Sequence, residues 1–391
     1  MTLRVLHIDT ERGWRGGQRQ TLWLAQELAR RGHLSLIAAR HGELLATRAH
    51  DCGIEVIDCS PAMEVDPRTA WRIRRVVDAR AIDVVHAHAA HAVGVAALAL
   101  LGRKHRVPLV VSRRVDFPLR HNAGTRWKYG RAATIVAISN AVARVLEESG
   151  IDRDRIDVVP DGVDVHRRVE PASSELLASL GVAAGYPLVV QVAQLVGHKD
   201  PLTFIRAMSR VREKVPSVAA LMVGDGPLRA DVTREIELLG LQRTIRLAGY
   251  RTDADSLLAA ATVACLSSRE EGMGSVLLDA LSFGLAVAAT RAGGIPEVII
   301  DGESGVLARR EDPDDLARAI VSLITDDALA RRVRAAARAR ALEFSVERMA
   351  DRTVRIYERV LGDTPDSSVR ANAARATAAT SSSSASVTRA P

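Results

Sequence analysis

Short apolar runs of strand length alternate with helical patterns along most of this chain, and the series occurs twice. In the first half the runs lie at residues 3–9, 34–39, 54–57, 82–86, 109–112, 133–138 and 156–159. The second series lies at residues 188–193, 218–223, 244–248, 262–266 and 285–289. Alternation of strands and helices is typical of doubly wound parallel sheets. The sequence therefore predicts an α/β protein with two such sheets.

The two series indicate two Rossmann-like domains, and the chain is long enough for each to bury its own core. We place the first domain at residues 1–168 and the second at residues 182–343. Parallel sheets of this kind bind ligands beyond the carboxyl ends of their strands, so we expect the site in a cleft between two facing domains. Residues 363–391 consist mainly of Ala, Ser, Thr and Arg, and we expect them to be disordered.

The cysteines and the first residues of the chain indicate its cellular compartment, and the charge distribution suggests its binding partners. Cys52, Cys59 and Cys265 are an odd number without the spacing of a metal site, which favours a reduced compartment. The chain starts with a strand pattern rather than a signal peptide, so we expect a cytoplasmic protein.

Residues 103–131, the basic stretch, contain nine basic residues and one acidic residue. This stretch could bind nucleic acid, an anionic acceptor or a membrane surface. The alternative is a surface that contacts only solvent.

The segment from Glu271 to Asp279 combines two acidic residues with a glycine-rich turn and the start of a helix. Glycines let the turn expose its backbone, N–H groups at a helix start bind phosphate, and we expect Ser275 to cap a helix that begins near Val276. Glu271 would accept hydrogen bonds from ligand hydroxyls, and Asp279 from a second set. The alternative is a helix start whose acidic residues bind nothing. The turn and helix start comprise Gly272, Met273, Gly274, Ser275 and Val276.

Two further segments follow expected strands of the first half. Gly16 and Gly17 would let the backbone approach a ligand, although the pattern is not the G-x-G-x-x-G of dinucleotide binding, and a plain flexible loop is the alternative. His86 and His88 end the run IDVVHAH, where a histidine can donate to a ligand hydroxyl or orient an acceptor. The H-x-H spacing also suggests a metal, but the sequence shows no third ligand, so we predict no metal site.

Taken together, these segments resemble the retaining glycosyltransferases of family 4. The residues Glu271 and Asp279 around G-x-G, followed by GGIPE, resemble the family's E-x7-E signature, with Asp in place of the second Glu. In that family the first acidic residue contacts the donor sugar and the second holds the nucleotide ribose. The run DVVHAH resembles the family's DVxHxH segment, which implies that His88 lies beside the donor sugar and that His86 supports it. The family's Gly-Gly loop faces the donor phosphates and matches Gly16 and Gly17.

Three more matches concern the leaving group, the acceptor and the linker. VAQLVGHKD resembles the family's GRLxxxKG block, whose Arg and Lys neutralise the diphosphate; Lys199 is retained, but Gln194 stands at the Arg position. Arg113 and Arg114 stand where many members have Thr and His, and they could bind a phosphate or carboxylate of the acceptor. PDGVD resembles the PNGVD linker, with Asp161 in place of Asn.

The resemblance implies the GT-B fold, in which a last helix, here residues 344–362, crosses back to the first domain. It implies a retaining transfer from a nucleotide-diphosphate sugar, which is the donor substrate, to a glycan or lipid-linked acceptor in cell-envelope polysaccharide or lipopolysaccharide synthesis. Glu271, His88 and Lys199 form the implied catalytic set. No cofactor is implied, and no metal, since Lys199 and helix amides would hold the diphosphate and no Asp-x-Asp occurs near the proposed donor site.

Other classes stay open. A sugar-nucleotide epimerase shares the fold, but we identify no acid/base pairs for it. A non-enzymatic nucleic-acid-binding protein would use the basic stretch yet leave Glu271, Asp279 and Lys199 unexplained, so we expect no nucleic-acid partner. Because family members often act at a membrane face, we predict peripheral binding to the anionic inner face of the membrane, with Trp127, Lys128 and Arg131 among the contacts.

Overall fold

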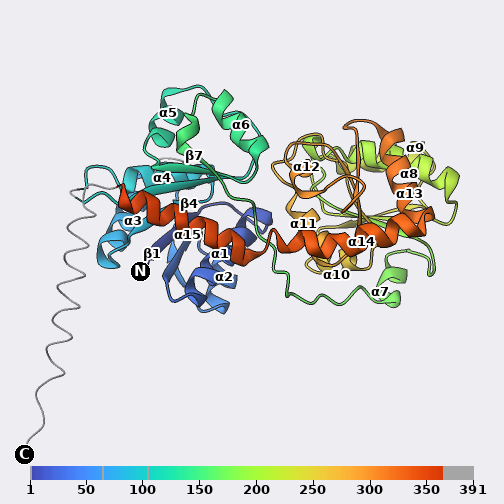
Figure 1. The fold of residues 1–391 in the computed structure, drawn as a ribbon, viewed down its shortest axis with the longest axis horizontal. Coiled ribbons are helices and arrows are strands. Elements are labelled where there is room, and N and C mark those ends of the chain that lie inside the picture. Colours follow the sequence, from blue (N-terminus) through green and yellow to red (C-terminus); the bar gives the residue numbers. More distant parts are fainter. Residues whose placement is uncertain (1, 64–65, 104, 364–391) are drawn as a thin grey trace, which may run out of the picture. The chain divides into compact units, whose positions relative to one another are not determined.

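The computed structural model describes residues 2–63, 66–103 and 105–363 of the chain (Figure 1). The chain forms two compact units, neither of them continuous in sequence. The first unit comprises Met1–Ser112, Arg120–Val136 and Ala350–Pro391, and the second comprises Arg113–Leu119 and Ala137–Met349. The segment expected to be disordered, residues 363–391, lies outside the described residues except for Asp363.

One sheet has seven strands in the order β3-β2-β1-β4-β5-β6-β7, and its pairs from β3 to β5 are parallel. Strand β1 is flanked by β2 on one side and by β4 on the other, so the winding direction reverses between β1 and β4. We call this position the first switch point. Strands β1 and β4 are almost entirely buried, which is why they appear in the sequence as continuous apolar runs. The strands are β1 (Arg4–Asp9), β2 (Leu34–Ala39), β3 (Glu55–Asp58), β4 (Val84–Ala87), β5 (Leu109–Arg113), β6 (Thr134–Ala137) and β7 (Ile156–Val158).

The helices between these strands begin and end at recognisable residues. Helix α3 begins at Pro67, and the Asp66 side chain accepts hydrogen bonds from the backbone N–H groups of Arg68 and Thr69. Helix α4 is largely buried, as its apolar sequence predicts. The helices are α1 (Gly16–Arg30), α2 (Leu44–Asp51), α3 (Pro67–Ala79), α4 (Ala90–Ala99), α5 (Ala123–Gly130), α6 (Asn140–Glu148), with the 3-10 turn η1 (Arg153–Arg155), and the last helix α15 (Val346–Gly362).

The second sheet has six strands in the order β10-β9-β8-β11-β12-β13, and all of its pairs are parallel. Its order repeats that of the first sheet, so the winding reverses between β8 and β11, at the second switch point. Strand β13 was not expected from the sequence, although the equally short β7 was. The strands are β8 (Leu188–Val192), β9 (Ala219–Val223), β10 (Ile245–Gly249), β11 (Val263–Leu266), β12 (Ala286–Thr290) and β13 (Val306–Ala308).

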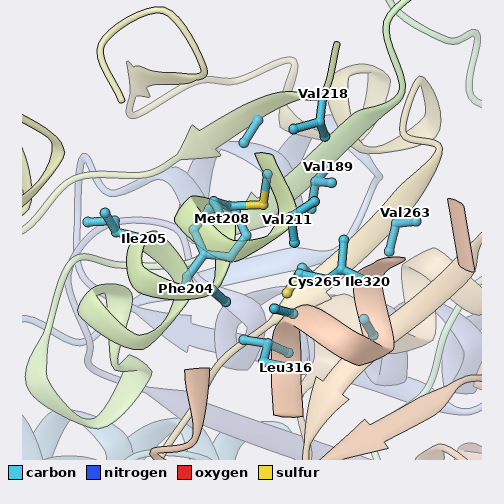
Figure 2. Packing of buried hydrophobic residues seen from close by; sticks show 14 of the residues in the cluster. Val189, Phe204, Ile205, Met208, Val211, Val218, Val263, Cys265, Leu316 and Ile320 are labelled. Carbon is cyan, nitrogen blue, oxygen red and sulfur yellow. The ribbon is translucent and has the colours of Figure 1, made fainter. Parts of the chain in front are cut away.

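The core of the second unit is aliphatic, with one aromatic ring at its centre. Figure 2 shows Phe204 and Met208 of α8 packed with Val189 of β8, Cys265 of β11 and Ile320 of α13. This packing fixes α8 against the strands that lead into the second switch point. The helical segments are α7 (Ser174–Ser179), η2 (Gly197–Lys199), α8 (Pro201–Lys214), α9 (Arg229–Leu238), α10 (Ala254–Ala259), α11 (Ser275–Ser282), α12 (Ile295–Val298), α13 (Pro313–Thr325) and α14 (Asp327–Leu342).

The two compact units do not coincide with the domains expected at residues 1–168 and 182–343. Those domain boundaries stay predictions. Helix α6 belongs to the second unit, and at its start the Glu297 side chain accepts hydrogen bonds from the backbone N–H groups of Asn140 (2.8 Å) and Ala141 (2.9 Å). At the other end of the chain, α15 belongs to the first unit from Ala350 onward. None of the helices in the described residues has the length and apolar character needed to cross a membrane.

Candidate functional site

Lys199 and Glu271 meet at the second switch point. Because β8 and β11 are neighbours in the sheet, the loops that follow them emerge side by side. Lys199 lies in the loop after β8 and Glu271 in the loop after β11, 72 residues apart, and Lys199 Nζ donates a hydrogen bond to Glu271 Oε2. Ser268 Oγ donates to the same carboxylate oxygen at 2.9 Å. The two residues that the resemblance assigns to the diphosphate and the donor sugar therefore occupy one site.

Buried hydrogen bonds hold these two loops together. The Ser267 hydroxyl lies 3.1 Å from the carbonyl oxygen of Lys199 and 2.9 Å from that of Asp200. Gln191 Nε2 donates to this hydroxyl at 2.8 Å, and the Arg269 backbone N–H donates to the His198 carbonyl at 2.8 Å. The loop that carries Lys199 is thus fixed to the loop that carries Glu271 before any ligand binds.

The helix start after Glu271 differs from the expectation in one respect. Helix α11 begins at Ser275, and the residue before it is Gly274, in the left-handed conformation at φ 79°. Ser275 is therefore the first helical residue rather than the cap, because the chain turns at Gly274 into a conformation that favours glycine. Gly272 and Met273 are buried, whereas Ser275 and Val276 are half-buried.

The GGIPE segment packs directly against this turn. Gly293 has φ 47°, and a Cβ atom there would lie 1.9 Å from the Glu271 carbonyl oxygen. The Gly294 backbone N–H donates to that same oxygen at 3.0 Å. A side chain at position 293 would displace the turn, so this glycine sets the position of the Glu271 backbone.

Asp279, in the middle of α11, is 2% exposed. Its Oδ1 lies 3.2 Å from Arg167 Nη2, and Arg167 Nη1 lies 2.5 Å from Asp255 Oδ2. Asp255 and Asp253 form an Asp-x-Asp, which we expected to be absent near this site. That expectation was wrong, because α10 brings Asp255 to the arginine that contacts Asp279. Asp253 pairs with Arg251 at 2.7 Å, so each of the two carboxylates has a guanidinium partner.

Gln194, at the position of the family's Arg, is exposed on the loop after β8. Arg113 and Arg114 belong to the segment Arg113–Leu119 of the second unit. Arg113 Nη2 donates to the Phe117 carbonyl at 2.5 Å, and Arg114 Nε lies 3.1 Å from Asp161 Oδ1. Two departures from the family motifs, Arg114 and Asp161, thus form an ion pair, and both side chains are largely buried.

The same segment places Asp116 and Phe117 beside the Glu271 turn. Burial raises the pKa of Asp116, the charges of Glu271 and Glu270 raise it further, and a hydrogen bond from the Glu271 backbone N–H opposes both effects. The Phe117 ring meets the His198 ring edge-on, with 5.4 Å between centroids. Burial lowers the pKa of His198, and the neighbouring Lys199 charge lowers it further. Sequence reasoning missed both titratable groups, since only the folded chain brings them to the turn.

A buried histidine network occupies the first switch point. His7 of β1 and His86 of β4 are register partners on neighbouring strands. His7 Nδ1 lies 2.9 Å from His88 Nε2, while His86 Nδ1 lies 2.6 Å from the Tyr357 hydroxyl and His86 Nε2 2.9 Å from Ser112 Oγ. His88 is therefore hydrogen-bonded to His7, which sequence reasoning missed because residue 7 is remote in the chain.

Among the described residues, His7, His86 and His88 also form a group that could hold a metal ion, because one ring nitrogen of each lies within 4.8 Å of those of the other two. The sequence showed no third ligand for the H-x-H pair, and His7 supplies one. A metal ion would have to displace a hydrogen bond of His86, because one of its ring nitrogens pairs with Tyr357 and the other with Ser112. We therefore describe the group as a hydrogen-bonded network.

Gly16 and Gly17 are the first two residues of α1. They follow β1 at the same switch point, and both are half-buried. The Asp9 side chain, at the end of β1, accepts a hydrogen bond from Thr21 Oγ1 of α1 at 3.1 Å. The helix start is thus held against the strand end, and its first amides lie at the carboxyl edge of the sheet.

The basic stretch includes helix α5. The Arg131 guanidinium lies over the Trp127 ring, 5.3 Å from its centroid. Lys128, which we expected to contact a membrane, is only 9% exposed, with its Nζ 3.5 Å from the Ala90 carbonyl oxygen. That expectation was wrong because this position of the helix faces inward. Exposed cations on and around α5 are Arg120, Arg126 and Arg131.

Two α/β units with the same strand order, each with polar residues gathered at its switch point, fit the GT-B fold. The model of the family described as Glycosyltransferase Family 4 matches residues 14–167, and that of Glycosyl transferases group 1 matches residues 173–340. The chain belongs to the family 4 glycosyltransferases.

Relatives and a solved structure agree with this assignment. Alpha-maltose-1-phosphate synthase of Mycolicibacterium smegmatis is 30% identical over 318 residues, 74% of this chain and 82% of that protein. Lipopolysaccharide core biosynthesis glycosyltransferase LpsE of Rhizobium meliloti is 30% identical over 224 residues, 57% of this chain and 62% of that protein. The crystal structure of Anabaena Alr3699/HepE in complex with UDP-glucose has a TM-score of 0.79, at 22% identity, and covers 91% of this chain and 100% of that one. This last likeness shows the fold.

Proposed function

We propose that this glycosyltransferase moves a sugar from a nucleotide-diphosphate sugar to a hydroxyl of a glycan or lipid-linked acceptor, with retention of configuration. The observation that carries the proposal is the pairing of Lys199 with Glu271 beside the start of α11. A cation for a diphosphate, a carboxylate for sugar hydroxyls and helix amides for phosphate oxygens lie in one place. This combination suits a nucleotide-sugar donor.

In the proposed reaction the bond between C1 of the sugar and the diphosphate oxygen breaks while the acceptor hydroxyl attacks C1 from the same face. Lys199 and the amides at the start of α11 stabilise the departing charge, and a leaving phosphate oxygen takes the acceptor's proton. Glu271 accepts a hydrogen bond from a donor hydroxyl, Asp279 accepts from the ribose, and His88 donates to the sugar. The donor must therefore separate Lys199 from Glu271 and give each its own partner.

The positive charge that the diphosphate needs comes from the chain itself in this proposal, so neither a metal nor a cofactor takes part. Transfer should then persist when EDTA is added. Loss of activity on chelation, with recovery on adding manganese, would contradict this part of the proposal.

The donor class is tested by a thermal-shift panel of UDP, ADP and GDP sugars, because a ligand that binds the folded state raises Tm by mass action. The crystal structure of a fold neighbour with UDP-glucose supports a nucleotide sugar as donor and makes UDP-glucose the first compound to test. Each sugar that raises Tm is then incubated with acceptors, and the anomeric configuration of the product is measured by NMR. A panel without any shift, or a product of inverted configuration, would overturn the proposal.

We also propose that the protein is cytoplasmic and acts in cell-envelope polysaccharide or lipopolysaccharide synthesis, bound to the inner face of the membrane. The exposed side chains of Arg120, Arg126 and Arg131 support this, since each cation near an anionic surface contributes about 1 kcal/mol. The relative that acts in lipopolysaccharide core biosynthesis points to the same class of acceptor.

Vesicle co-sedimentation tests the membrane proposal. Vesicles with phosphatidylglycerol should bind the protein at low salt and release it at high salt, while neutral phosphatidylcholine vesicles should not bind it. The double variant Arg120→Gln, Arg126→Gln should bind less, whereas the matched variant Arg331→Gln, Arg332→Gln, in the second unit, should bind as well as the wild type. Equal and negligible binding to both vesicle types would leave a solvated surface as the explanation.

A further inference from the structure

Arg167 joins three elements of the second unit. It lies in the segment between β7 and α7 and reaches two carboxylates at once. Its Nη1 lies 2.5 Å from Asp255 Oδ2 in the first turn of α10, and its Nη2 lies 3.2 Å from Asp279 Oδ1 in α11. The guanidinium carbon lies 5.5 Å from the centroid of the Phe283 ring, at the end of α11.

Arg167 is a cationic partner of the buried Asp279 carboxylate. The Asp279 side chain is 3% exposed, and a buried carboxylate without a cation or hydrogen-bond donors is strongly unfavourable. Asp279 also replaces the longer Glu of the family signature, so its carboxylate lies closer to the helix axis. Because Asp255 and the Phe283 ring restrict the plane of the guanidinium, Arg167 presents its N–H groups to the Asp279 carboxylate in a defined orientation.

We propose that Arg167 is a positioning residue for the nucleotide: it holds Asp279 in the orientation in which the carboxylate accepts hydrogen bonds from the ribose. The inference rests on the proposed function, in which Asp279 receives the ribose hydroxyls. A carboxylate has about four acceptor sites, so pairing with one guanidinium nitrogen is compatible with ribose binding. Sequence reasoning missed Arg167, because no motif relates residue 167 to residues 255 and 279.

Calorimetric titration with UDP, ADP and GDP tests the inference on the full chain. For the diphosphate that binds the wild type, Arg167→Gln should weaken binding about tenfold, the size of effect that follows from loosening one charged hydrogen bond. The donor KM should rise by a similar factor, while kcat stays within about twofold, because the reacting atoms lie beyond the ribose. Arg206→Gln, which breaks a surface ion pair with Glu235 in the same unit, is the matched control and should change neither value.

A double-mutant cycle shows whether Arg167 acts through Asp279. In an Asp279→Asn background, Arg167→Gln should cause no further loss of affinity, and the 3′-deoxy form of the nucleotide should lose less affinity from Arg167→Gln than the parent does. Equal losses of affinity in both backgrounds and with both nucleotides would overturn the inference. Arg167 would then only stabilise the fold or bind a phosphate group. If Arg167→Gln fails to fold, Arg167→Lys, which keeps the charge but not the fork, should show a smaller loss that also vanishes in the Asp279→Asn background.

The result also separates this inference from the proposed function. If none of the three diphosphates binds the wild type, the proposed function fails and the inference fails with it. If a diphosphate binds the wild type and the folded Arg167 variants with equal affinity, only the inference fails.

Discussion

The two switch points share one topology and differ in chemistry. At the first, between β1 and β4, three buried histidines gather: His7 is hydrogen-bonded to His88, and His86 is hydrogen-bonded to Ser112 and to Tyr357. At the second, between β8 and β11, the pairs are ionic and link Lys199 to Glu271. The strand order thus determines where polar residues gather, and the residue types determine what they can bind.

This contrast separates recognition of neutral groups from recognition of charged groups. Imidazole rings suit sugar hydroxyls, which are neutral donors and acceptors. A diphosphate carries charge, so it needs a lysine and helix amides, and these are found at the second switch point. Before the donor binds, the cation and the carboxylate there neutralise each other, which avoids leaving either charge unpaired in a partly buried site.

The largest effect should come from Glu271 itself. Glu271→Ala removes the acceptor for a donor hydroxyl, and we expect turnover to fall by at least about 100-fold, as for other groups that act on the transition state. The exposed neighbour on the same turn provides the control: Glu270→Ala should retain near-wild-type turnover. Measuring kcat and Tm of both variants decides the matter, and a folded Glu271→Ala protein with normal turnover would remove Glu271 from the site.

Lys199 should come next. Lys199→Ala leaves the departing diphosphate without its cation, which should cost about 2–4 kcal/mol of transition-state stabilisation. Because Gln194 stands at the position of the family's Arg, adding Gln194→Arg should restore part of the rate. The measurements are kcat/KM for the donor and nucleotide affinity by titration. Unaltered affinity in Lys199→Ala, together with no rescue by the second change, would show that the two side chains do not share the diphosphate.

A smaller effect is expected at the first switch point. His88→Ala should cost about 1–2 kcal/mol of transition-state stabilisation, the value of one or two neutral hydrogen bonds. Added salt should reduce the donor affinity that Lys199 supplies but leave the His88 contribution unchanged, since only the former is a charge–charge interaction. His86→Ala should instead lower Tm, because His86 bonds to Ser112 and Tyr357. If the Lys199 and His88 contributions to donor affinity depend equally on salt, the contrast between a charged and a neutral switch point is wrong.

The smallest effect concerns stability rather than activity. Burial raises the pKa of Asp116, so the folded protein binds this proton more tightly than the unfolded chain does. The free energy of unfolding therefore contains a contribution from the protonated carboxyl group. This contribution is complete below the unfolded pKa and is lost as the pH rises through the folded pKa. Asp116→Asn should therefore raise Tm at pH 7, on the order of 1–2 °C. The gain should disappear at a pH below 3.8, the ordinary value for this group. Calorimetric scans across this range provide the check, and a pH-independent gain would show that the carboxyl charge is not its cause.

The sheets could be predicted from the sequence because their signal is local. A strand buried on both faces is a continuous apolar run, and β2 was expected at the residues it occupies, 34–39. Strand β13, of three residues, was not expected, although β7, of the same length, was. At the turn after Glu271, the glycines were recognised but the cap was placed at Ser275, because composition alone does not say which residue adopts the left-handed conformation.

The site could be predicted in part, for the residues that lie within one motif. Glu271 and Asp279 belong to a strand–turn–helix pattern that the sequence shows directly, whereas Lys199 was assigned to the site only through the resemblance to the family. His7, Arg167 and the pairing of Arg114 with Asp161 could not be predicted, since each joins positions far apart in the chain. Such contacts depend on strand register and on how loops fold back, and neither is written in a local pattern.

The most direct test is a crystal structure with the nucleotide-diphosphate sugar that gives the largest thermal shift. The diphosphate should lie between Lys199 Nζ and the first amides of α11, the ribose on Asp279, and a sugar hydroxyl on Glu271. Lys199 and Glu271 should no longer be hydrogen-bonded to each other. A nucleotide bound away from the second switch point, or one that leaves the Lys199–Glu271 pair intact, would contradict the account.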